Sequence, residues 1–513
     1  VDHNRRYMIV EMHAFLSPAV AILPAWVSIH TSREVAMKSR TVDVAIIGAG
    51  TAGLNARRAV EKAGGQPLLI ESGEYGTTCA RVGCMPSKLL IAAADAAHEV
   101  ATAGGFGIDV PDWQVDGTRV LARVQRERDG FAGMVAANTE ALPAGQRLLG
   151  HARFTGPTTL QVGDHTRVEA RAVVIASGSS AFIPPPFDAI SKDLLTSDNL
   201  FEQKTLPGSL AVIGTGIIGL ELGQALQRLG VSVTFFNPFN ELGPFTDPVV
   251  EEAAQSILTA ELDLRLQSSV QSATRVTGGV ELRYVDQAGS EHTAVFEKVL
   301  VAAGRRPNIT DLNLASTGLQ LDERGFPEWD PRTTQAADAP IFLAGDVSGH
   351  RPLLHEASDE GEIAGANSML YPNAAAHVRR TPLAIAFTDP QMAMTGLAFD
   401  QLDRDAVEIG EASFESQGRA RVMGQNRGVV RLYAQRSDCK LVGAEMIGPR
   451  AEHMAHLLAW AIQEGMPVKR ALEMPFYHPV LEEGLRTALR DLAAKLRVTG
   501  ECREEDFASA PGN

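Results

Sequence analysis

The sequence predicts an α/β protein in which two Rossmann-like units are followed by a separate α+β domain. Two stretches carry this prediction, "VDVAIIGAGTAGLNARRAVEKAGGQPLLIE" at 42–71 and "LAVIGTGIIGLELGQALQRLGVSVTFFN" at 210–237. Each reads as an apolar strand, a glycine-rich turn, a helix and a second strand, and continuous apolar runs are typical of parallel strands buried on both faces. At 513 residues the chain is too long for one core, so we expect several domains.

The net charge argues against two classes of partner. A formal charge of −15 gives no sign of the excess positive charge with which proteins bind nucleic acid or an anionic membrane. Residues 14–29, "AFLSPAVAILPAWVSI", resemble the apolar part of a signal peptide, but two prolines interrupt them and they are shorter than a membrane span. We therefore expect a cytoplasmic protein without a membrane or nucleic-acid partner. Residues 1–36 are interpreted as a disordered extension or as the result of an upstream start, because Met37 precedes the first expected strand by a few residues.

Four cysteines in so long a chain do not form the disulfide framework of a small secreted protein. A reducing compartment is the expectation that follows. Cys439 and Cys502 are interpreted as ordinary thiols.

The first glycine-rich turn has the spacing GxGxxG at Gly48, Gly50 and Gly53. Glycines at these positions allow a tight turn and the close approach of a pyrophosphate to a helix N-terminus, where main-chain N–H groups and the helix dipole favour anions. Glu71 ends the second strand 23 residues after Gly48, where a carboxylate can accept both ribose hydroxyls of an adenosine.

The second turn repeats the spacing at Gly214, Gly216 and Gly219. One such motif is weak evidence by itself, but two copies that each lie between a strand and a helix are much stronger. The same offset from Gly214 reaches Asn237, which is not acidic.

Three further strands end in small residues and glycine, at 172–178, 298–304 and 340–346. Ligands bind beyond the carboxyl ends of parallel strands, so these ends are expected to face nucleotides. Asp346 is therefore a candidate to bind cofactor hydroxyls. The alternative is that Asp346 is the N-cap of the following helix.

After about residue 379 the pattern changes to that of an α+β domain. His453 and His456 are interpreted as ordinary residues of a helix face, because no third ligand is evident, and no metal site is expected. The expected elements are strands at 383–387, 428–434 and 441–447 and helices near 451–464 and 480–497.

Cys79 and Cys84 lie five residues apart in "YGTTCARVGCMPSKLL". In a regular helix their Cα atoms would be about 8 to 9 Å apart, beyond the roughly 7 Å that a disulfide tolerates, so the pair can close only in a distorted first turn. Gly76 and Gly83 supply that freedom. So short a loop would stabilise the fold by only about 2 kcal/mol, whereas a thiolate near a helix N-terminus and Lys88 would exchange readily. Two buried structural thiols and half of a metal site are the alternatives.

The segment "TTCARVGCMPSK" resembles the CxxxxC redox motif of the flavin-dependent pyridine nucleotide-disulfide oxidoreductases. Within that family the chain resembles the dihydrolipoamide dehydrogenases most, through "GTGIIGLELGQALQRLG" and "MPSKLL". GAGTAG, the cysteine pair, ASG, the second GxGxxG, AAGRRPN, FLAGD, FTDP and HPVLEE follow in the order of that family. The resemblance extends over about residues 40–495. It implies two Rossmann-like domains, one for FAD and one for NAD, and a C-terminal α+β dimerisation domain.

The resemblance also implies domain bounds and cofactor contacts. The bounds are an FAD-binding domain at 37–185, an NAD(P)-binding domain at 186–306, a continuation of the FAD domain at 307–378, a dimerisation domain at 379–500 and a tail at 501–513. FAD contacts are implied for Gly48, Gly50, Gly53, Glu71, Lys88, His151, Ala152, Gly178 and Asp346. Nicotinamide nucleotide contacts are implied for Gly214, Gly216, Gly219, Asn237, Val270, Gly304 and Arg305.

The same resemblance assigns the catalytic residues. His478 in "FYHPVLEEGL" would be the base that takes the proton of a substrate thiol, and Glu483 would hold its ring. In the family this dyad reaches the cysteines of the other subunit, so a homodimer is implied. Lys88, paired with Glu221, would tune the electrostatics of the flavin.

The implied activity is oxidation of dihydrolipoamide by NAD⁺ through Cys79 and Cys84, with the lipoyl groups carried on separate subunits of a complex. Asn237 stands where a glutamate is expected at an NAD site, yet 238–242 contain no arginine for a 2′-phosphate, so NAD is expected and NADP stays open. The alternatives are an NADPH-dependent reductase of another disulfide or of a metal ion, and a flavoprotein subunit of a complex without lipoamide turnover.

Overall fold

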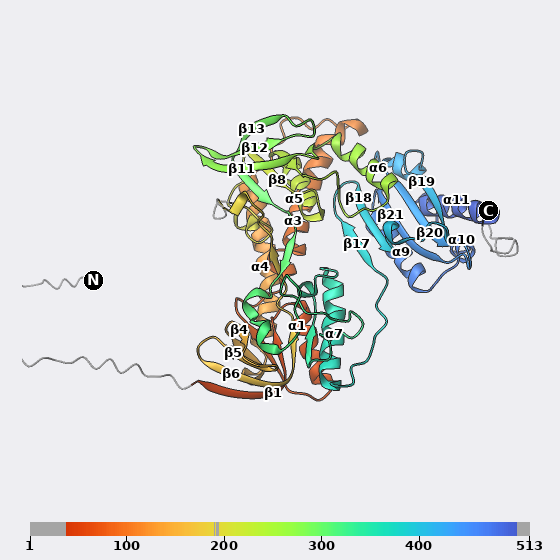
Figure 1. The fold of residues 1–513 in the computed structure, drawn as a ribbon. Helices are drawn as coiled ribbons and strands as arrows, with labels where there is room; N and C mark the ends of the chain where they lie inside the picture. Colours follow the sequence, from red (N-terminus) through yellow and green to blue (C-terminus); the bar gives the residue numbers. More distant parts are fainter. Residues whose placement is uncertain (1–36, 189, 191–193, 500–513) are drawn as a thin grey trace, which may run out of the picture.

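The computed structural model describes residues 37–188, 190 and 194–499. The expected N-terminal extension at 1–36 and the tail at 501–513 lie outside these residues. Figure 1 shows the two nucleotide-binding regions one above the other, with the C-terminal domain at the side.

The first sheet has seven strands and a parallel centre. β1 lies between β2 and β6, parallel to both, and β16 returns from far along the chain to pair in parallel with β6. The carboxyl ends of these strands therefore meet at one edge. The strands are β1 (Lys38–Ile47), β2 (Pro67–Glu71), β3 (Arg147–Leu149), β4 (Ala152–Phe154), β5 (Thr159–Val162), β6 (Thr166–Ile175) and β16 (Ile341–Leu343).

Helices α1 (Thr51–Lys62) and α7 (Leu354–Leu370) pack against each other beside this sheet (Figure 1). Their close approach requires a glycine, because a Cβ at Gly361 would lie 2.2 Å from the carbonyl oxygen of Ala52. Helix α1 follows β1 after three residues, so it begins at the edge of the sheet where the parallel strands end.

The second nucleotide-binding region has a four-stranded parallel sheet of β8 (Ser209–Ile213), β9 (Ser232–Phe236), β10 (Asp263–Arg265) and β14 (Lys298–Val301). Helices α5 (Ile217–Arg228) and α6 (Pro248–Thr259) follow β8 and β9. An antiparallel sheet that sequence reasoning did not identify accompanies it, formed by β11 (Ser269–Val276), β12 (Gly279–Val285) and β13 (Glu291–Phe296).

The C-terminal domain is α+β, as expected, and its antiparallel sheet has five strands in the order β17-β18-β21-β20-β19. Two of them, β18 and β19, were missed. The strands are β17 (Leu383–Ala386), β18 (Gln391–Gly396), β19 (Val407–Ser413), β20 (Val429–Gln435) and β21 (Leu441–Gly448), and the helices are α8 (Gly418–Val422), α9 (Ala451–Gln463), α10 (Val468–Leu472) and α11 (Glu483–Thr499).

A helical hairpin joins the three parts of the molecule. α3 (Cys84–Thr102) packs against α4 (Gly117–Glu140) and against α5 of the second nucleotide-binding region (Figure 1). One apolar cluster runs from α3 and α4 through α5 to Ala386, Met392 and Ile447 of the C-terminal sheet. This cluster thus connects the helix that begins at Cys84 to the second nucleotide-binding region and to the C-terminal domain. The remaining short elements used below are α2 (Thr78–Arg81), β7 (Ser179–Ala181) and β15 (Arg305–Pro307).

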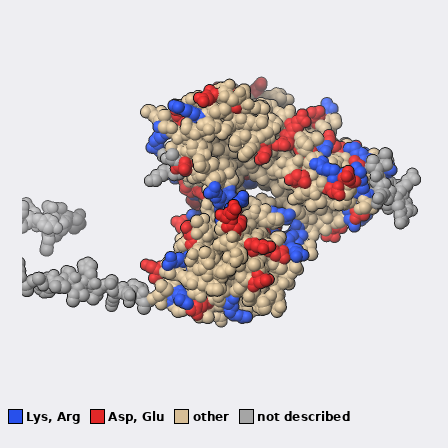
Figure 2. Space-filling model, in the orientation of Figure 1, with Lys and Arg blue, Asp and Glu red and all other residues tan. Residues whose placement is uncertain are grey.

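Cys439 is buried and disulfide-bonded, so its interpretation as an ordinary thiol was wrong. Cys502 lies outside the described residues. Within the described ranges, no helix is both long and apolar enough to span a membrane. On the face shown in Figure 2, acidic and basic side chains are intermixed.

Candidate active site

The two cysteines lie on either side of a break between helices. Cys79 is in α2, and Cys84 is the first residue of α3. Gly83 separates the helices with φ −116° and ψ −116°, which is not helical, so the separation that a regular helix would impose does not apply. Both cysteines are thiols in this structure, and they are close enough that each shifts the pKa of the other.

The pKa values of the two thiols are shifted in opposite directions. The pKa of Cys84 is lowered to about 6, chiefly because Cys79 donates a hydrogen bond to its thiolate and also because Lys88 is nearby, although burial opposes this. The pKa of Cys79 is raised, because it keeps its proton in the bond to Cys84 and because it is partly buried. Cys84 is therefore the sulfur that carries negative charge.

Lys88 lies one helical turn after Cys84 and is paired with Glu221 of α5. Its Nζ is 2.7 Å from Oε2 of Glu221, a residue that is only 5% exposed. The other oxygen, Oε1, accepts the N–H of Phe387 at 2.8 Å. The expected pairing of Lys88 with Glu221 is thus observed.

His478 and Glu483 form the expected pair in the C-terminal domain. Nδ1 of His478 lies 3.0 and 3.1 Å from the two oxygens of Glu483, and this contact is the main reason that the pKa of Glu483 is lowered. The His478 side chain is 80% exposed, so its second nitrogen, Nε2, is accessible to another molecule. Within the residues that the structure describes, no hydrogen bond joins this pair to Cys79 or Cys84 of the same chain.

The first glycine turn is shaped for a diphosphate. A Cβ at Gly48 would lie 2.2 Å from the carbonyl oxygen of Ala176, and one at Gly53 would lie 1.9 Å from that of Gly48. Both positions therefore require glycine, because the main chain approaches these carbonyl groups too closely for any side chain. A Cβ at Gly50 would meet no atom within 4 Å, which leaves open space at the start of α1. Oε2 of Glu71 accepts the N–H of Ala49 at 2.8 Å. These features fit the adenosine diphosphate part of FAD.

The other residues assigned to FAD follow strands of the same sheet. His151 lies between β3 and β4, Ala152 is buried at the start of β4, and Gly178 follows β6 with φ 70°. Asp346 follows β16, and its Oδ2 accepts a hydrogen bond from Ser179 Oγ at 3.0 Å. The N-cap of α7 is Leu353, so the alternative that Asp346 caps this helix was wrong.

The second glycine turn has the same shape as the first. A Cβ at Gly219 would lie 2.2 Å from the carbonyl oxygen of Gly214, whereas one at Gly216 would meet open space. Asn237 differs from Glu71, because it is 8% exposed and its amide donates to Thr215 Oγ1 at 2.5 Å and to the carbonyl of Glu241 at 2.9 Å. This amide therefore joins the loop that follows β9 to the second glycine turn.

The remaining residues assigned to the nicotinamide nucleotide are dispersed. Val270 is in β11, and Gly304 has φ 104° after β14. Arg305 donates from Nε to Ser179 Oγ at 2.8 Å and from Nη2 to Ser179 O at 2.6 Å. Its guanidinium is thus connected through Ser179 to Asp346 of the other nucleotide-binding region.

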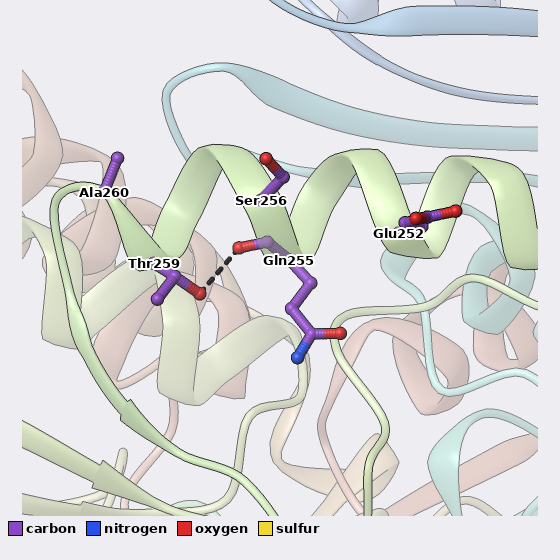
Figure 3. Close-up of a pocket in the computed structure, with 5 residues that line it drawn as sticks. All are labelled: Glu252, Gln255, Ser256, Thr259 and Ala260. Carbon is purple, nitrogen blue, oxygen red and sulfur yellow. Dashed lines mark hydrogen bonds between the residues drawn. The ribbon is translucent and has the colours of Figure 1, made fainter.

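Sequence reasoning missed two contributors to this site, Ser179 and Phe387. Phe387 belongs to the FTDP motif, so a signal existed, but nothing in the motif indicates that Phe387 contacts Lys88. Among the described residues, no three His, Cys, Asp or Glu side chains are grouped to hold a metal ion. Figure 3 shows a surface hollow along α6, which contains none of the residues assigned above and is lined by Glu252, Gln255, Ser256, Thr259 and Ala260.

Comparison with known families identifies two regions of the chain. Residues 42–361 match the family "Pyridine nucleotide-disulphide oxidoreductase", and residues 383–489 match "Pyridine nucleotide-disulphide oxidoreductase, dimerisation domain". Dihydrolipoyl dehydrogenase of Halobacterium salinarum is 31% identical over 463 residues, which are 88% of this chain and 96% of the relative. Dihydrolipoyl dehydrogenase of Thermus scotoductus is 30% identical, with 88% and 98% covered.

Two solved structures show the same fold. The flavoprotein disulfide reductase RclA of Escherichia coli superposes with a TM-score of 0.74 at 23% identity, covering 88% of this chain and 99% of its own. LpdA of Mycobacterium tuberculosis superposes with a TM-score of 0.75 at 24% identity, with the same coverage. The prediction of a nucleotide-binding α/β fold with a C-terminal dimerisation domain is thereby confirmed.

Proposed function

Since the chain belongs to the pyridine nucleotide-disulphide oxidoreductases, enzymes that act on sulfur groups with FAD and NAD(P), we propose that it oxidises dihydrolipoamide with NAD⁺. The observation that carries the proposal is the thiol pair itself. Cys79 and Cys84 lie on either side of the break between α2 and α3 and shift each other's pKa, and Cys84 lies one helical turn before Lys88. Cys84 is therefore the better leaving group as a thiolate, and Cys79 is the sulfur that a substrate thiol would attack.

The proposed exchange starts from the Cys79–Cys84 disulfide. A substrate thiol loses its proton to His478 and attacks Sγ of Cys79, which breaks the disulfide and releases Cys84 as a thiolate. The second substrate thiol then attacks the sulfur attached to Cys79, which releases the cyclic disulfide and leaves both cysteines reduced. FAD held at the turn of Gly48, Gly50 and Gly53 would supply the two-electron chemistry that connects the reduced cysteines with NAD⁺. Glu483 stabilises the imidazolium form of His478 while the proton is held there.

The base in this scheme belongs to a second subunit. His478 exposes Nε2 and makes no bond to the thiols of its own chain within the described residues, and the domain that carries it matches a dimerisation family. The active unit we propose is a homodimer in which the partner subunit's His478 faces Cys79. Lipoyl groups on separate chains are the proposed natural substrate, in the cytoplasm.

The domain bounds and cofactor contacts expected from the sequence are part of the same proposal. Parallel pairing of β16 with β6 supports the assignment of 307–378 to the FAD-binding domain. The open space at Gly50 and at Gly216 supports one diphosphate at each turn. NAD is the proposed nucleotide, and the neutral Asn237 keeps NADP as an alternative.

A steady-state assay of the purified holoenzyme tests the proposal. Dihydrolipoamide, glutathione disulfide and Hg²⁺ are each supplied with NAD(H) and with NADP(H). The expected result is fastest turnover of dihydrolipoamide with NAD⁺, which Cys84→Ser abolishes. Faster turnover of glutathione disulfide or Hg²⁺ with NADPH would contradict the proposal and identify that compound as the better substrate. A flavin-containing protein without any of these activities would favour a role as a subunit of a complex.

A further inference from the structure

One face of α5 holds a short segment of the C-terminal domain. Glu221, Gln224 and Arg228 are three and four residues apart and therefore lie on one side of the helix. Gln224 accepts the N–H of Asp389 at 2.8 Å and donates to its carbonyl at 2.9 Å. Nη2 of Arg228 is 3.0 Å from the Asp389 carboxylate. The main chain at 387–389 is thus fixed against α5.

This attachment places the ring of Phe387 beside Lys88. Nζ of Lys88 lies 4.5 Å from the ring centroid and 2.7 Å from Oε2 of Glu221. The ammonium group therefore has a carboxylate as one neighbour and an aromatic face as another, and both attract a cation. The N–H of Phe387 also binds Oε1 of Glu221, so one residue contacts both members of the ion pair.

The ion pair in turn acts on a thiol. Cys84 and Lys88 are four residues apart in α3, where side chains on successive turns are neighbours. The charged or titratable groups that act on Cys84 are Cys79, Lys88 and Glu221: Lys88 favours the thiolate, whereas Glu221 opposes it. The distance of the Lys88 ammonium from Cys84 therefore determines how far this cation lowers the pKa of the thiol.

We infer that Phe387 is a positioning residue for the redox centre. Its ring holds the Lys88 ammonium next to Cys84, and its N–H orients the Glu221 carboxylate. The segment 387–389 of the C-terminal domain thereby sets the charge environment of a thiol in the FAD-binding domain. This inference rests on the proposed function, in which Cys84 is the sulfur released as a thiolate.

The test compares Phe387→Leu with Phe387→Tyr in the reduced holoenzyme. Leucine keeps the N–H that binds Glu221 and removes only the aromatic face, whereas tyrosine keeps both. The rate at which iodoacetamide alkylates Cys84 is followed from pH 4.5 to 9 by mass spectrometry of the labelled peptide. In Phe387→Leu the midpoint is expected to move to higher pH, so that alkylation at pH 6, relative to pH 9, falls about two- to fivefold. Phe387→Tyr is expected to keep the wild-type midpoint.

Phe399→Leu is the matched control. It removes an aromatic ring of the same domain that also lies under a guanidinium, since Arg404 Cζ is 3.2 Å from its centroid. The control is expected to leave the midpoint unchanged. If Phe387→Leu does not fold, Phe387→Met replaces it, because methionine fills more of the same volume without an aromatic face.

The outcomes separate this inference from the proposed function. An unchanged midpoint in a folded Phe387→Leu protein, or an equal shift in Phe399→Leu, overturns the positioning role alone. A wild-type protein in which Cys84 does not titrate below the ordinary range of a thiol contradicts the proposed function itself.

Discussion

Glu71 is the last residue of β2 and Asn237 follows the last residue of β9, but the two side chains bind their glycine turns differently. Glu71 accepts the N–H of Ala49, whereas Asn237 donates to the hydroxyl of Thr215 and to the carbonyl of Glu241. A carboxylate at 237 would accept ribose hydroxyls and repel a 2′-phosphate. Asn237→Glu is therefore expected to increase the preference for NADH over NADPH about tenfold or more. Fluorescence titration of the holoenzyme with each nucleotide measures the two dissociation constants.

Asn240→Glu adds the same charge to an exposed position of the same loop and serves as the control for the nucleotide experiment. It is expected to change the preference much less. Equal effects of the two variants would show that position 237 has no special role in nucleotide choice.

The pH dependence of thiol reactivity follows from the thiol pair. Because the pKa of Cys84 is lowered to about 6, its thiolate is present above that pH and is lost as the pH falls through it. Alkylation of Cys84 is expected to be half-maximal near pH 6, while Cys79 reacts only at much higher pH. Mass spectrometry of the two labelled peptides distinguishes the sites, and faster labelling of Cys79 at pH 7 would reverse the assignment.

Glu221→Gln changes the charge next to Lys88 without changing the shape of the side chain. The carboxylate of Glu221 raises the pKa of Cys84, so its removal leaves the Lys88 cation free to act on the sulfur. The midpoint of Cys84 alkylation is expected to move to lower pH. A midpoint that moves to higher pH would mean that Glu221 supports the thiolate mainly by holding Lys88 in place.

Glu483→Gln removes the charge that holds His478. The imidazolium formed during thiol deprotonation loses its stabilising carboxylate, so kcat/KM for dihydrolipoamide is expected to fall about tenfold or more. The neighbouring Glu482→Gln is the control and should retain activity. Nucleotide binding should be equal in both variants, and equal loss of activity in both would argue against a specific dyad.

The glycines of the first turn provide a test of the FAD site that separates folding from binding. Gly53→Ala places a Cβ 1.9 Å from the carbonyl oxygen of Gly48, so the protein is expected to lose stability by several kcal/mol or to fail to fold. Gly50→Ala meets no protein atom and is expected to fold but to retain less FAD. Far-ultraviolet circular dichroism and the absorbance ratio of flavin to protein measure these two effects. Full flavin content in Gly50→Ala would exclude a diphosphate from this turn.

Local patterns in the sequence were sufficient for the two strand-turn-helix-strand units and for the α+β character of the C-terminal domain. Hydrophobic periodicity and glycine spacing are patterns among neighbouring residues, and these elements are formed mainly by interactions among neighbouring residues. They were insufficient for β18 and β19, and for the sheet of β11, β12 and β13. Strand formation there depends on partners, and short strands with partly exposed faces have weak patterns.

The sequence by itself determined the nucleotide-binding turns and placed Lys88 one helical turn from Cys84, because these relationships lie within single elements. Tertiary structure alone decided that Asn237 donates to Thr215 of the second glycine turn, that Ser179 connects Arg305 with Asp346, and that Phe387 contacts the pair of Lys88 and Glu221. These contacts join residues up to 299 positions apart, the separation of Lys88 from Phe387 (387 − 88). Such contacts form only when packed domains bring the side chains together, so no local spacing encodes them.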